Sequence, residues 1–369
     1  MRSSPTCQLA LKPDVVEARQ RLDAFWNNAP VDRPALHITV RNPGFSAPAW
    51  GGPADAKERD WLPQWQAHRA HQVGSRRYLA EAMPLASVDF GSCLALVPVL
   101  LGADYMYENG TAWIKPLADV YERPLPVFDP AHPLLAILAT GMEQASAVLA
   151  GQGVLNPPAF GLDPLTILSL LRGAEQLCLD LVEEPERVEA WLAAANRVYL
   201  AAHAHLHAKA QALGHHGSAS WLHTWAPGSF EVLQCDAAVM LSKGMFARFA
   251  LPALRAQDEQ LDYSLYHLDG VCQLRFLDQL RSLPRLRGIQ WNPEPPANHI
   301  EDPRWLAEFK RIRDLGFILQ FNAWESRSVE QVVAVVKALG PRGLMFALPT
   351  FERREDAEAA IRSISAACR

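Results

Sequence analysis

From residue 260 onward the chain repeats one pattern four times, and this repeat most constrains the fold. Each unit is a short apolar run followed by a stretch in which apolar residues recur with helical spacing. The apolar runs are residues 263–268, 286–291, 317–321 and 343–348, and the helical stretches are 274–283, 305–315, 329–339 and 355–367. Buried strands that alternate with helices are typical of a parallel sheet covered by helices. Four such units in a row predict half of a closed (β/α)₈ barrel.

The chain before residue 260 contains four further apolar runs at less regular spacing. They are residues 35–40, 86–89, 153–156 and 218–223. A segment after the second run, residues 113–116, predicts a hairpin over the barrel mouth, and residues 164–213 predict a long helical stretch broken near Pro185. We therefore expect an α/β fold with one domain over residues 1–369. It is an eight-stranded TIM barrel with an N-terminal extension and a hairpin insertion after strand 2.

Composition and charge exclude several classes of function. Lys and Arg number 35 against 40 Asp and Glu, which gives a formal net charge of -5 and no basic footprint for nucleic acid. No apolar run is long enough to span a bilayer, and the N-terminus resembles no signal peptide, so we expect a cytoplasmic protein. The six cysteines are scattered and should be free thiols. Without a G-x-G-x-x-G, a P-loop or a G-x-S-x-G motif, we expect no nucleotide cofactor and no serine hydrolase chemistry.

Barrels of this kind take their catalytic groups from the carboxyl ends of the strands. The polar and aromatic residues that end or follow the predicted strands include Asp89, Asn156, Trp225, Asp236, His267, Asp269, Trp291, Asn292, Glu294 and Asn322. Carboxylates, amides and indoles together are suited to bind a small polar organic molecule. We predict that the substrate contacts Asp89, Asn156, Trp225, Trp291, Asn292 and Asn322.

The segment from Tyr266 to Gly270 contains the most informative pair, His267 and Asp269. Residues two apart on a strand point to the same face, which at a strand end is the barrel mouth. A histidine there is a metal ligand or a general acid or base, and the aspartate is a ligand or a partner of the imidazole. The alternative is a structural histidine and a helix-capping aspartate. We predict catalytic roles for His267, Asp269 and Asp236.

Histidines also recur on the long helical stretch, at positions 203, 205 and 207. His203 and His207 are four residues apart and could face a metal. No glutamate follows the first histidine, however, as it does in metalloprotease helices. We expect this set to lie on a solvated helix face.

Several short motifs, in order along the chain, resemble those of uroporphyrinogen decarboxylase-like proteins. They are Gly161-Leu162-Asp163-Pro164-Leu165-Thr166 with Leu171-Arg172-Gly173, then Glu184-Pro185-Glu186-Arg187-Val188, Phe249-x-Leu251-Pro252 and His267-Leu268-Asp269-Gly270. The resemblance runs from about residue 30 to the C-terminus and implies the barrel fold. Its members include cofactor-free decarboxylases. They also include corrinoid-dependent methyltransferases and cobalamin-independent methionine synthase, which use zinc to form a thiolate acceptor.

The sequence departs from the decarboxylase itself, because the arginine-rich R-Q-A-G-R-Y motif is absent and only Arg33 and Arg41 lie nearby. Asp89 is also no clean match for the aspartate that holds the pyrrole N–H groups. We therefore do not expect uroporphyrinogen decarboxylase activity.

The departure from the zinc methyltransferases is smaller. They carry His-x-Cys after the fifth strand and a further cysteine after the last. Here His267 matches, Asp269 takes the place of the first cysteine, and no cysteine follows the eighth run. The resemblance therefore implies a site for zinc or another divalent metal at His267 and Asp269, with Glu294, or alternatively Glu325, as the third ligand. The chain is most similar to members with H-L-D-G and the strand-six sequence I-Q-W, a subgroup without an assigned substrate.

Three functions remain open at this point. The leading one is a metal-dependent, methyltransferase-like group-transfer enzyme with a small-molecule substrate, for which a corrinoid protein as partner and a homodimer are also expected. The second is a metal-free lyase, decarboxylase or hydrolase that uses paired carboxylates. The third is a ligand-binding barrel without catalysis.

Overall fold

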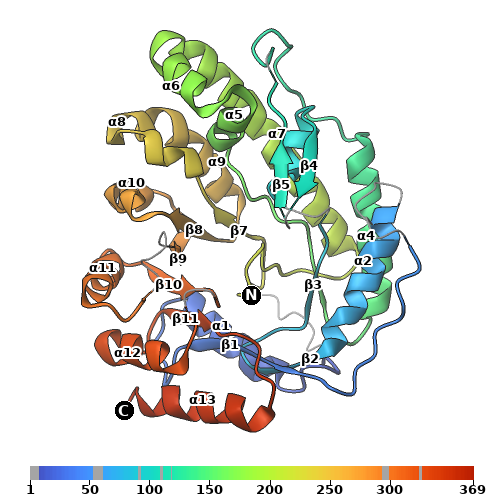
Figure 1. Cartoon of the computed structure of the whole chain (residues 1–369), viewed down its shortest axis with the longest axis vertical. Coiled ribbons are helices and arrows are strands. Elements are labelled where there is room, and N and C mark those ends of the chain that lie inside the picture. The colour runs from blue at the N-terminus through green and yellow to red at the C-terminus, as the bar shows by residue number, and fades with distance from the viewer. Residues whose placement is uncertain are drawn as a thin grey trace.

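The computed structural model describes residues 8–52, 61–89, 93–108, 111–117, 119–292, 299–323 and 326–369. The strands are β1 (Ala35–Arg41), β2 (Arg76–Ala80), β3 (Leu85–Ser87), β4 (Tyr105–Glu108), β5 (Thr111–Ile114), β6 (Val154–Asn156), β7 (Phe230–Leu233), β8 (Tyr263–Asp269), β9 (Leu286–Asn292), β10 (Ile318–Phe321) and β11 (Leu344–Ala347). Most of them surround a common centre, and the helices lie outside (Figure 1).

The helices alternate with the strands along the chain. The α-helices are α1 (Val15–Trp26), α2 (Leu62–His71), α3 (Leu96–Leu100), α4 (Pro133–Leu149), α5 (Pro164–Arg172), α6 (Ala174–Glu183), α7 (Pro185–Ala212), α8 (Lys243–Met245), α9 (Leu251–Gln260), α10 (Leu277–Leu280), α11 (Pro303–Asp314), α12 (Val329–Leu339) and α13 (Arg354–Ala366). Short 3₁₀ segments are η2 (Gln72–Ser75), η3 (Asp236–Met240) and η5 (Val271–Phe276), and η4 (Phe246–Ala250) is a π-helical turn. The order confirms an α/β fold.

The main sheet has seven strands in the order β2-β1-β11-β10-β9-β8-β7. Every pair in it is parallel except β1 with β2, and β3 and β6 form a separate parallel pair. Among the described residues, no hydrogen-bonded ladder joins β2 to β3 or β6 to β7. The strands therefore surround a centre without one continuous ring of hydrogen bonds in the described part of the chain.

Seven of the eight predicted strands are present, and the prediction of a strand at residues 218–223 is wrong. Residues 218–223 form turns, closed by an isolated antiparallel bridge between Ser218 and Ala226, and the strand at this place is β7. The serines explain the difference. The Ser218 hydroxyl accepts from the Phe230 amide at 2.8 Å, and Ser220 has a φ of 49°, outside the range of a strand. We refer to residues 218–226 below as the serine loop.

The insertion after β3 is the expected hairpin, β4 with β5. The apolar pattern did not reveal β2, whose first two residues, Arg76 and Arg77, are exposed. The helical stretch breaks at Pro185, as expected, and also at Gly173, whose φ of 86° an L side chain rarely adopts.

Apolar residues inside the ring of strands support the polar ends of those strands. Leu265, Ile318 and Met345 are fully buried there. Their neighbours two residues on, His267 and Gln320, lie on the same face one layer closer to the carboxyl ends. An apolar layer therefore underlies a polar one, and the polar layer lies toward the carboxyl ends of the strands, where function is expected.

Two expectations from composition can be compared with the described residues. The five cysteines among them are free. No helix in the described part of the chain combines the length and the apolar character needed to cross a membrane.

Candidate functional site

Strands β8 and β9 bring four polar side chains to the carboxyl end of the sheet. His267 and Asp269 lie on one face of β8, above Leu265. The register pairs His267 with Gln290 and Asp269 with Asn292. Because paired residues of parallel strands point to the same side, the predicted pair has two amide partners that come from the neighbouring strand.

Gln290 fixes the protonation of His267. The Gln290 amide nitrogen donates to the Trp291 carbonyl at 2.7 Å, which leaves Gln290 Oε1 to accept from His267 Nδ1. The proton of the neutral ring is therefore on Nδ1, and Nε2 faces Asp269 Oδ1 at 4.0 Å. Burial lowers the pKa of His267. A neutral imidazole whose other nitrogen donates to an acceptor is the form that ligates a metal.

Asp236 completes the group from the end of β7. It begins η3, and its carboxylate accepts from the Gln234 amide at 3.3 Å. Burial, and then the charges of Asp269 and Asp163, raise the pKa of Asp236 to about 7. Asp269 is less buried and accepts from Asn292 Nδ2 at 2.7 Å. Two carboxyl groups of different environment therefore lie close together.

Asp236, His267 and Asp269, hereafter the mouth cluster, fit a divalent cation. One ligand atom from each lies within 4.8 Å of the others. A cation would relieve the repulsion between Asp236 and Asp269 that contributes to the raised pKa. Two carboxylates and one imidazole also form a donor set suited to zinc or a similar divalent ion.

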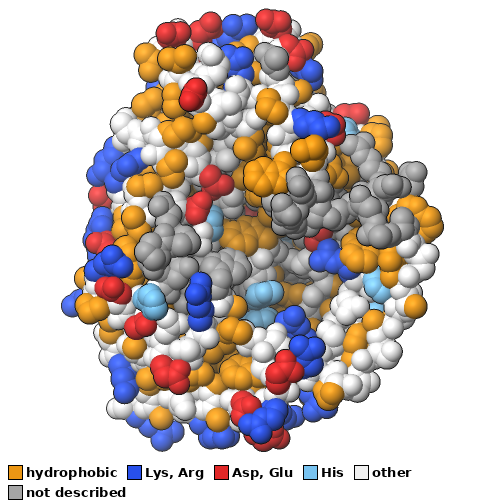
Figure 2. Space-filling model, viewed as in Figure 1, with side chains coloured by type: hydrophobic (Ala, Val, Ile, Leu, Met, Phe, Trp, Pro, Cys, Tyr) orange, Lys and Arg blue, Asp and Glu red, His pale blue; other side chains and the backbone are white. Residues whose placement is uncertain are grey.

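A cavity of about 390 Å³ lies at the same end of the strands. Its lining includes His37 and Thr39 of β1, Arg76 and Tyr78 of β2, Ser87 of β3, Arg69 of α2, and Trp221 and His223 of the serine loop. Trp221 joins the cavity to the mouth cluster, because its ring meets the His267 ring edge-on at 5.1 Å. Figure 2 shows histidine and acidic side chains around the hollow in the middle of this face.

The cavity walls include the guanidinium of Arg76 and several hydrogen-bonding groups. His37 and His223 stack at 4.5 Å, and burial followed by the charge of Arg76 lowers the pKa of His223. Arg76 donates to Thr350 at 2.8 Å and pairs with no carboxylate in the described part of the chain. His37 Nδ1 and Trp221 Nε1 are buried without a partner there. Such groups favour a polar ligand with an anionic part.

Two predicted substrate contacts have other roles. Asn156 is buried and links β6 to the serine loop, donating to the Ser220 carbonyl at 2.6 Å and accepting from the Ala219 amide at 2.7 Å. Trp225 lies at the opposite end of the strands, with Arg19 over its ring at 5.0 Å. The structure does not bring either side chain to the mouth cluster.

The remaining predicted residues divide between the mouth and the packing around it. Trp291 is fully buried against Trp305 and Phe309 of α11, on the outer side of β9. Asn322 is buried, and its Oδ1 accepts from the Gln320 amide at 3.0 Å. Asp89 pairs with Arg69, which lines the cavity, at 2.9 Å. Glu294, the third predicted metal ligand, lies outside the described residues, and Asp236 takes the third place in the mouth cluster.

Sequence reasoning missed the residues that hold or surround the predicted pair, notably Gln290, His37, Trp221 and His223. For Gln290 a signal exists, because it lies two residues before Asn292 and so shares its face. His37 likewise alternates with Ala35 and Thr39 along the first strand. Trp221 and His223 could not be placed, since the segment that holds them was assigned to a strand.

A larger cavity, about 650 Å³, opens at the amino ends of the strands. Residues that precede β6 and β7, such as Gly153 and Pro227, line it together with Trp225 and α1. None of the mouth cluster lines either cavity, but Trp221, which lines the smaller one, packs against His267. The catalytic groups of parallel-stranded barrels come from the carboxyl ends of the strands. We therefore take the smaller cavity as the candidate site.

Comparison with known proteins supports the fold. No known protein-family profile matches the chain, and no curated protein matches it either. Among solved structures, a methyltransferase from Methanosarcina mazei is similar, with a TM-score of 0.55 and 13% sequence identity over 95% of this chain and 98% of that one. At this identity the likeness shows a shared fold alone.

Proposed function

We propose that the chain is a metal-dependent group-transfer enzyme of the methyltransferase type that acts at the carboxyl ends of its strands. The observation that supports this best is the mouth cluster, in which Gln290 holds His267 in the tautomer that a metal requires. The fold shared with a methyltransferase agrees with the proposal. Assignment to the H-L-D-G subgroup of decarboxylase-like proteins remains a prediction from the motifs.

Each residue of the proposed site has a distinct task. Asp236, His267 and Asp269 would hold the cation, while Gln290 and Asn292 orient His267 and Asp269. When bound, a divalent ion lowers the pKa of a substrate thiol or hydroxyl and makes it nucleophilic at neutral pH. Trp221 lines the cavity and packs against His267, so it would cover one side of the bound substrate.

The cavity lining supports one class of substrate. We propose a small polar molecule whose anionic group binds near Arg76 and the stacked histidines. Its nucleophilic atom would then reach past Trp221 to the mouth cluster. A corrinoid protein as methyl donor and a homodimer belong to the same proposal.

A second function has one observation in its favour. Without a metal, Asp236 has a pKa of about 7 beside Asp269, whose side chain is more exposed. Such a pair can act as general acid and general base in a lyase or hydrolase. In that case chelators would leave turnover unchanged.

Zinc content and methyl transfer test the leading proposal together. The chelator-treated full chain, its His267→Ala variant and a matched His216→Ala control at an exposed position are reloaded with Zn²⁺. Transfer from methylcobalamin to a panel of carboxylate-bearing thiols is then followed. We expect His267→Ala to lose about one zinc ion per chain and all transfer, while His216→Ala keeps both. Equal zinc and equal transfer in the three proteins would refute the proposal.

A further inference from the structure

A second group of metal-ligating side chains lies between α7 and β7, away from the mouth. The sequence placed His203 and His207 on a solvated helix face, and this prediction is wrong. Their exposed fractions are 2% and 7%, and Glu231 of β7, which they face, is 1% exposed. His205, between them, is on the exposed side of the helix. We call His203, His207 and Glu231 the α7 cluster.

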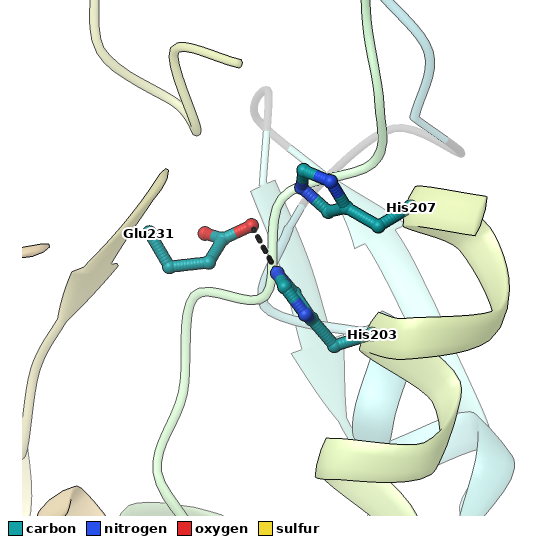
Figure 3. Close-up of side chains that lie close together, drawn as sticks. All are labelled: His203, His207 and Glu231. Atoms are coloured by element: carbon teal, nitrogen blue, oxygen red, sulfur yellow. Dashed lines mark ion pairs between the residues drawn. The ribbon is translucent and has the colours of Figure 1, made fainter. Parts of the chain in front are cut away.

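The three side chains converge on one point. Both imidazoles project from the same face of α7 toward the carboxylate (Figure 3). One ligand atom from each residue lies within 4.8 Å of the others, and His203 Nε2 is 3.7 Å from Glu231 Oε1. That separation is too long for a hydrogen bond. It is close to the distance of about 3.4 Å between two ligand atoms of a tetrahedral zinc with bonds of about 2.0–2.1 Å.

Buried polar atoms in the α7 cluster lack partners. His203 Nε2 and His207 Nε2 make no hydrogen bond in the described part of the chain. No Lys or Arg of the described residues pairs with Glu231, so burial raises its pKa to about 8. Unpaired buried polar groups are rare in proteins and call for an explanation. A cation at this point would satisfy all three residues.

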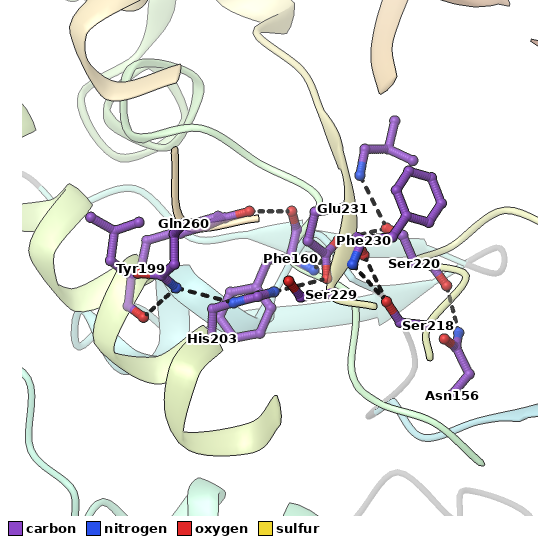
Figure 4. A network of polar contacts seen from close by, with 12 residues as sticks. Asn156, Phe160, Tyr199, His203, Ser218, Ser220, Ser229, Phe230, Glu231 and Gln260 are labelled. Carbon is purple, nitrogen blue, oxygen red and sulfur yellow. Dashed lines mark hydrogen bonds and ion pairs between the residues drawn. The ribbon is translucent and has the colours of Figure 1, made fainter. Parts of the chain in front are cut away.

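Hydrogen bonds orient two of the three side chains, Glu231 and His203 (Figure 4). Glu231 Oε2 accepts from the Ser220 hydroxyl at 2.6 Å and from the Phe160 amide at 3.3 Å, which leaves Oε1 for His203. Gln260 Nε2 lies 3.1 Å from His203 Nδ1. Gln260 Nε2 also donates to the Leu200 carbonyl at 3.0 Å. Metal binding at Nε2 of His203 puts the proton on Nδ1, so the Gln260 amide would have to turn and give up the Leu200 bond.

We propose that His203, His207 and Glu231 bind a structural divalent transition-metal ion, zinc by its ligand chemistry, at a site distinct from the mouth cluster. Two imidazoles and one carboxylate are a known zinc donor set that leaves the fourth position to water. The burial of all three side chains supports a structural role.

The proposed ion would stabilise the conformation of the serine loop. Glu231 accepts from Ser220, whose φ of 49° is unusual for a residue with a side chain. The next residue, Trp221, packs against His267, and His223 stacks on His37. Holding Glu231 in its charged form strengthens its bond to Ser220. The ion would thereby fix the loop that forms one wall of the cavity.

Zinc binding in a variant without the mouth cluster tests the proposal. The full chain with His267→Ala and Asp269→Asn is stripped with a chelator and dialysed against Zn²⁺ alone. We expect it to retain about one zinc per chain, with a raised melting temperature. Adding Glu231→Gln should weaken zinc binding at least about 100-fold, since the loss of an outer partner alone weakens metal sites about 10- to 100-fold. Adding His205→Ala, the matched control on the exposed face, should change nothing.

A variant that should still fold and a spectroscopic measurement protect this test against misfolded variants. Glutamine at position 231 can still accept from Ser220 and Phe160, so the variant should fold even if His207→Ala does not. Co²⁺ in place of zinc should give the intense visible bands of a tetrahedral site, and these should disappear with Glu231→Gln. The proposal fails if the mouth variant binds no zinc, or if Glu231→Gln and His205→Ala bind it equally. Wild-type zinc lost only with His267→Ala would leave the proposed function intact.

Discussion

The mouth cluster and the α7 cluster contain the same kinds of residue in similar geometry, yet they differ in what surrounds them. Each brings histidine and carboxylate atoms within 4.8 Å of one another. Asp269 in the mouth cluster has a side chain that is 42% exposed, whereas the α7 cluster is buried between a helix and a strand. An ion held by a partly exposed ligand set can reach a substrate, whereas an ion in a buried set supports structure.

The strongest test of this comparison is loss of turnover. Replacing His267 by alanine should lower kcat/KM for methyl transfer at least about 100-fold, because the site loses its only imidazole and the cation with it. His205→Ala on the exposed face of α7 should keep full turnover. The free energy of unfolding should fall by about 1–3 kcal/mol in His267→Ala, because buried Gln290 loses its donor, and by less than about 1 kcal/mol in His205→Ala. Kinetics and denaturant titration check both, and comparable turnover in the two variants would contradict the comparison.

The free energy of unfolding should depend more on the serine loop next to the α7 cluster than on the mouth. Asn156→Ala removes a buried amide that satisfies two backbone groups of the serine loop and contacts Ser87 at 3.0 Å. We expect a loss of about 2–4 kcal/mol in the free energy of unfolding. Asn292→Ala at the half-buried mouth should cost about 1 kcal/mol or less. Urea unfolding of both variants measures this, and equal losses would show that the serine loop is not tied down as described.

Acid should destabilise the protein through His37. Burial, then the charges of His223, Arg76 and Lys12, lower the pKa of His37 well below its usual value. The folded ring stays neutral while the unfolded one gains a proton below about pH 6.5, so stability is complete above that pH and decreases below it. Between pH 7 and 5, wild type should lose about 1–2 kcal/mol more than His37→Gln. A pH-independent difference in urea unfolding would exclude this role.

The smallest expected effect concerns substrate affinity. Arg76→Ala should raise the KM for a carboxylate-bearing thiol about 5- to 10-fold and leave kcat within about twofold, because it removes binding that is equal in the ground state and the transition state. Arg77→Ala, at the next position of β2, is the matched control and should have no effect. Steady-state kinetics of both variants with charged and neutral thiols measures this effect. If Arg76→Ala and Arg77→Ala have the same KM for the charged thiol, the proposed substrate needs no anionic group.

Sequence reasoning reached the mouth cluster because local pattern was enough. His267 and Asp269 lie on one strand, and the apolar runs that frame β8 to β11 predicted those strands within a few residues. Asp236 could be named because it follows the fourth predicted strand, residues 218–223, although that segment forms turns and the strand there is β7. The pattern could not give the tautomer of His267, since Gln290 comes from another strand.

The α7 cluster lay beyond sequence reasoning for a physical reason. Two histidines four residues apart share a helix face, but the spacing does not tell which face is buried. Their third partner, Glu231, belongs to a strand that was assigned twelve residues too early. The serines that disrupt that assignment act through side-chain hydrogen bonds to distant residues, which no local pattern reports.

The pairing of β1 with β11 has a consequence for the order of folding. Ala35 lies opposite Met345, so the first strand of the sheet finds its partner near the end of the chain. Contacts between residues so far apart form late, and until then both strands have an unpaired edge that can associate with other chains. During synthesis, β1 has only β2 as a neighbour until the last strand has left the ribosome. A chain that stops before residue 344 would retain this open edge and should aggregate.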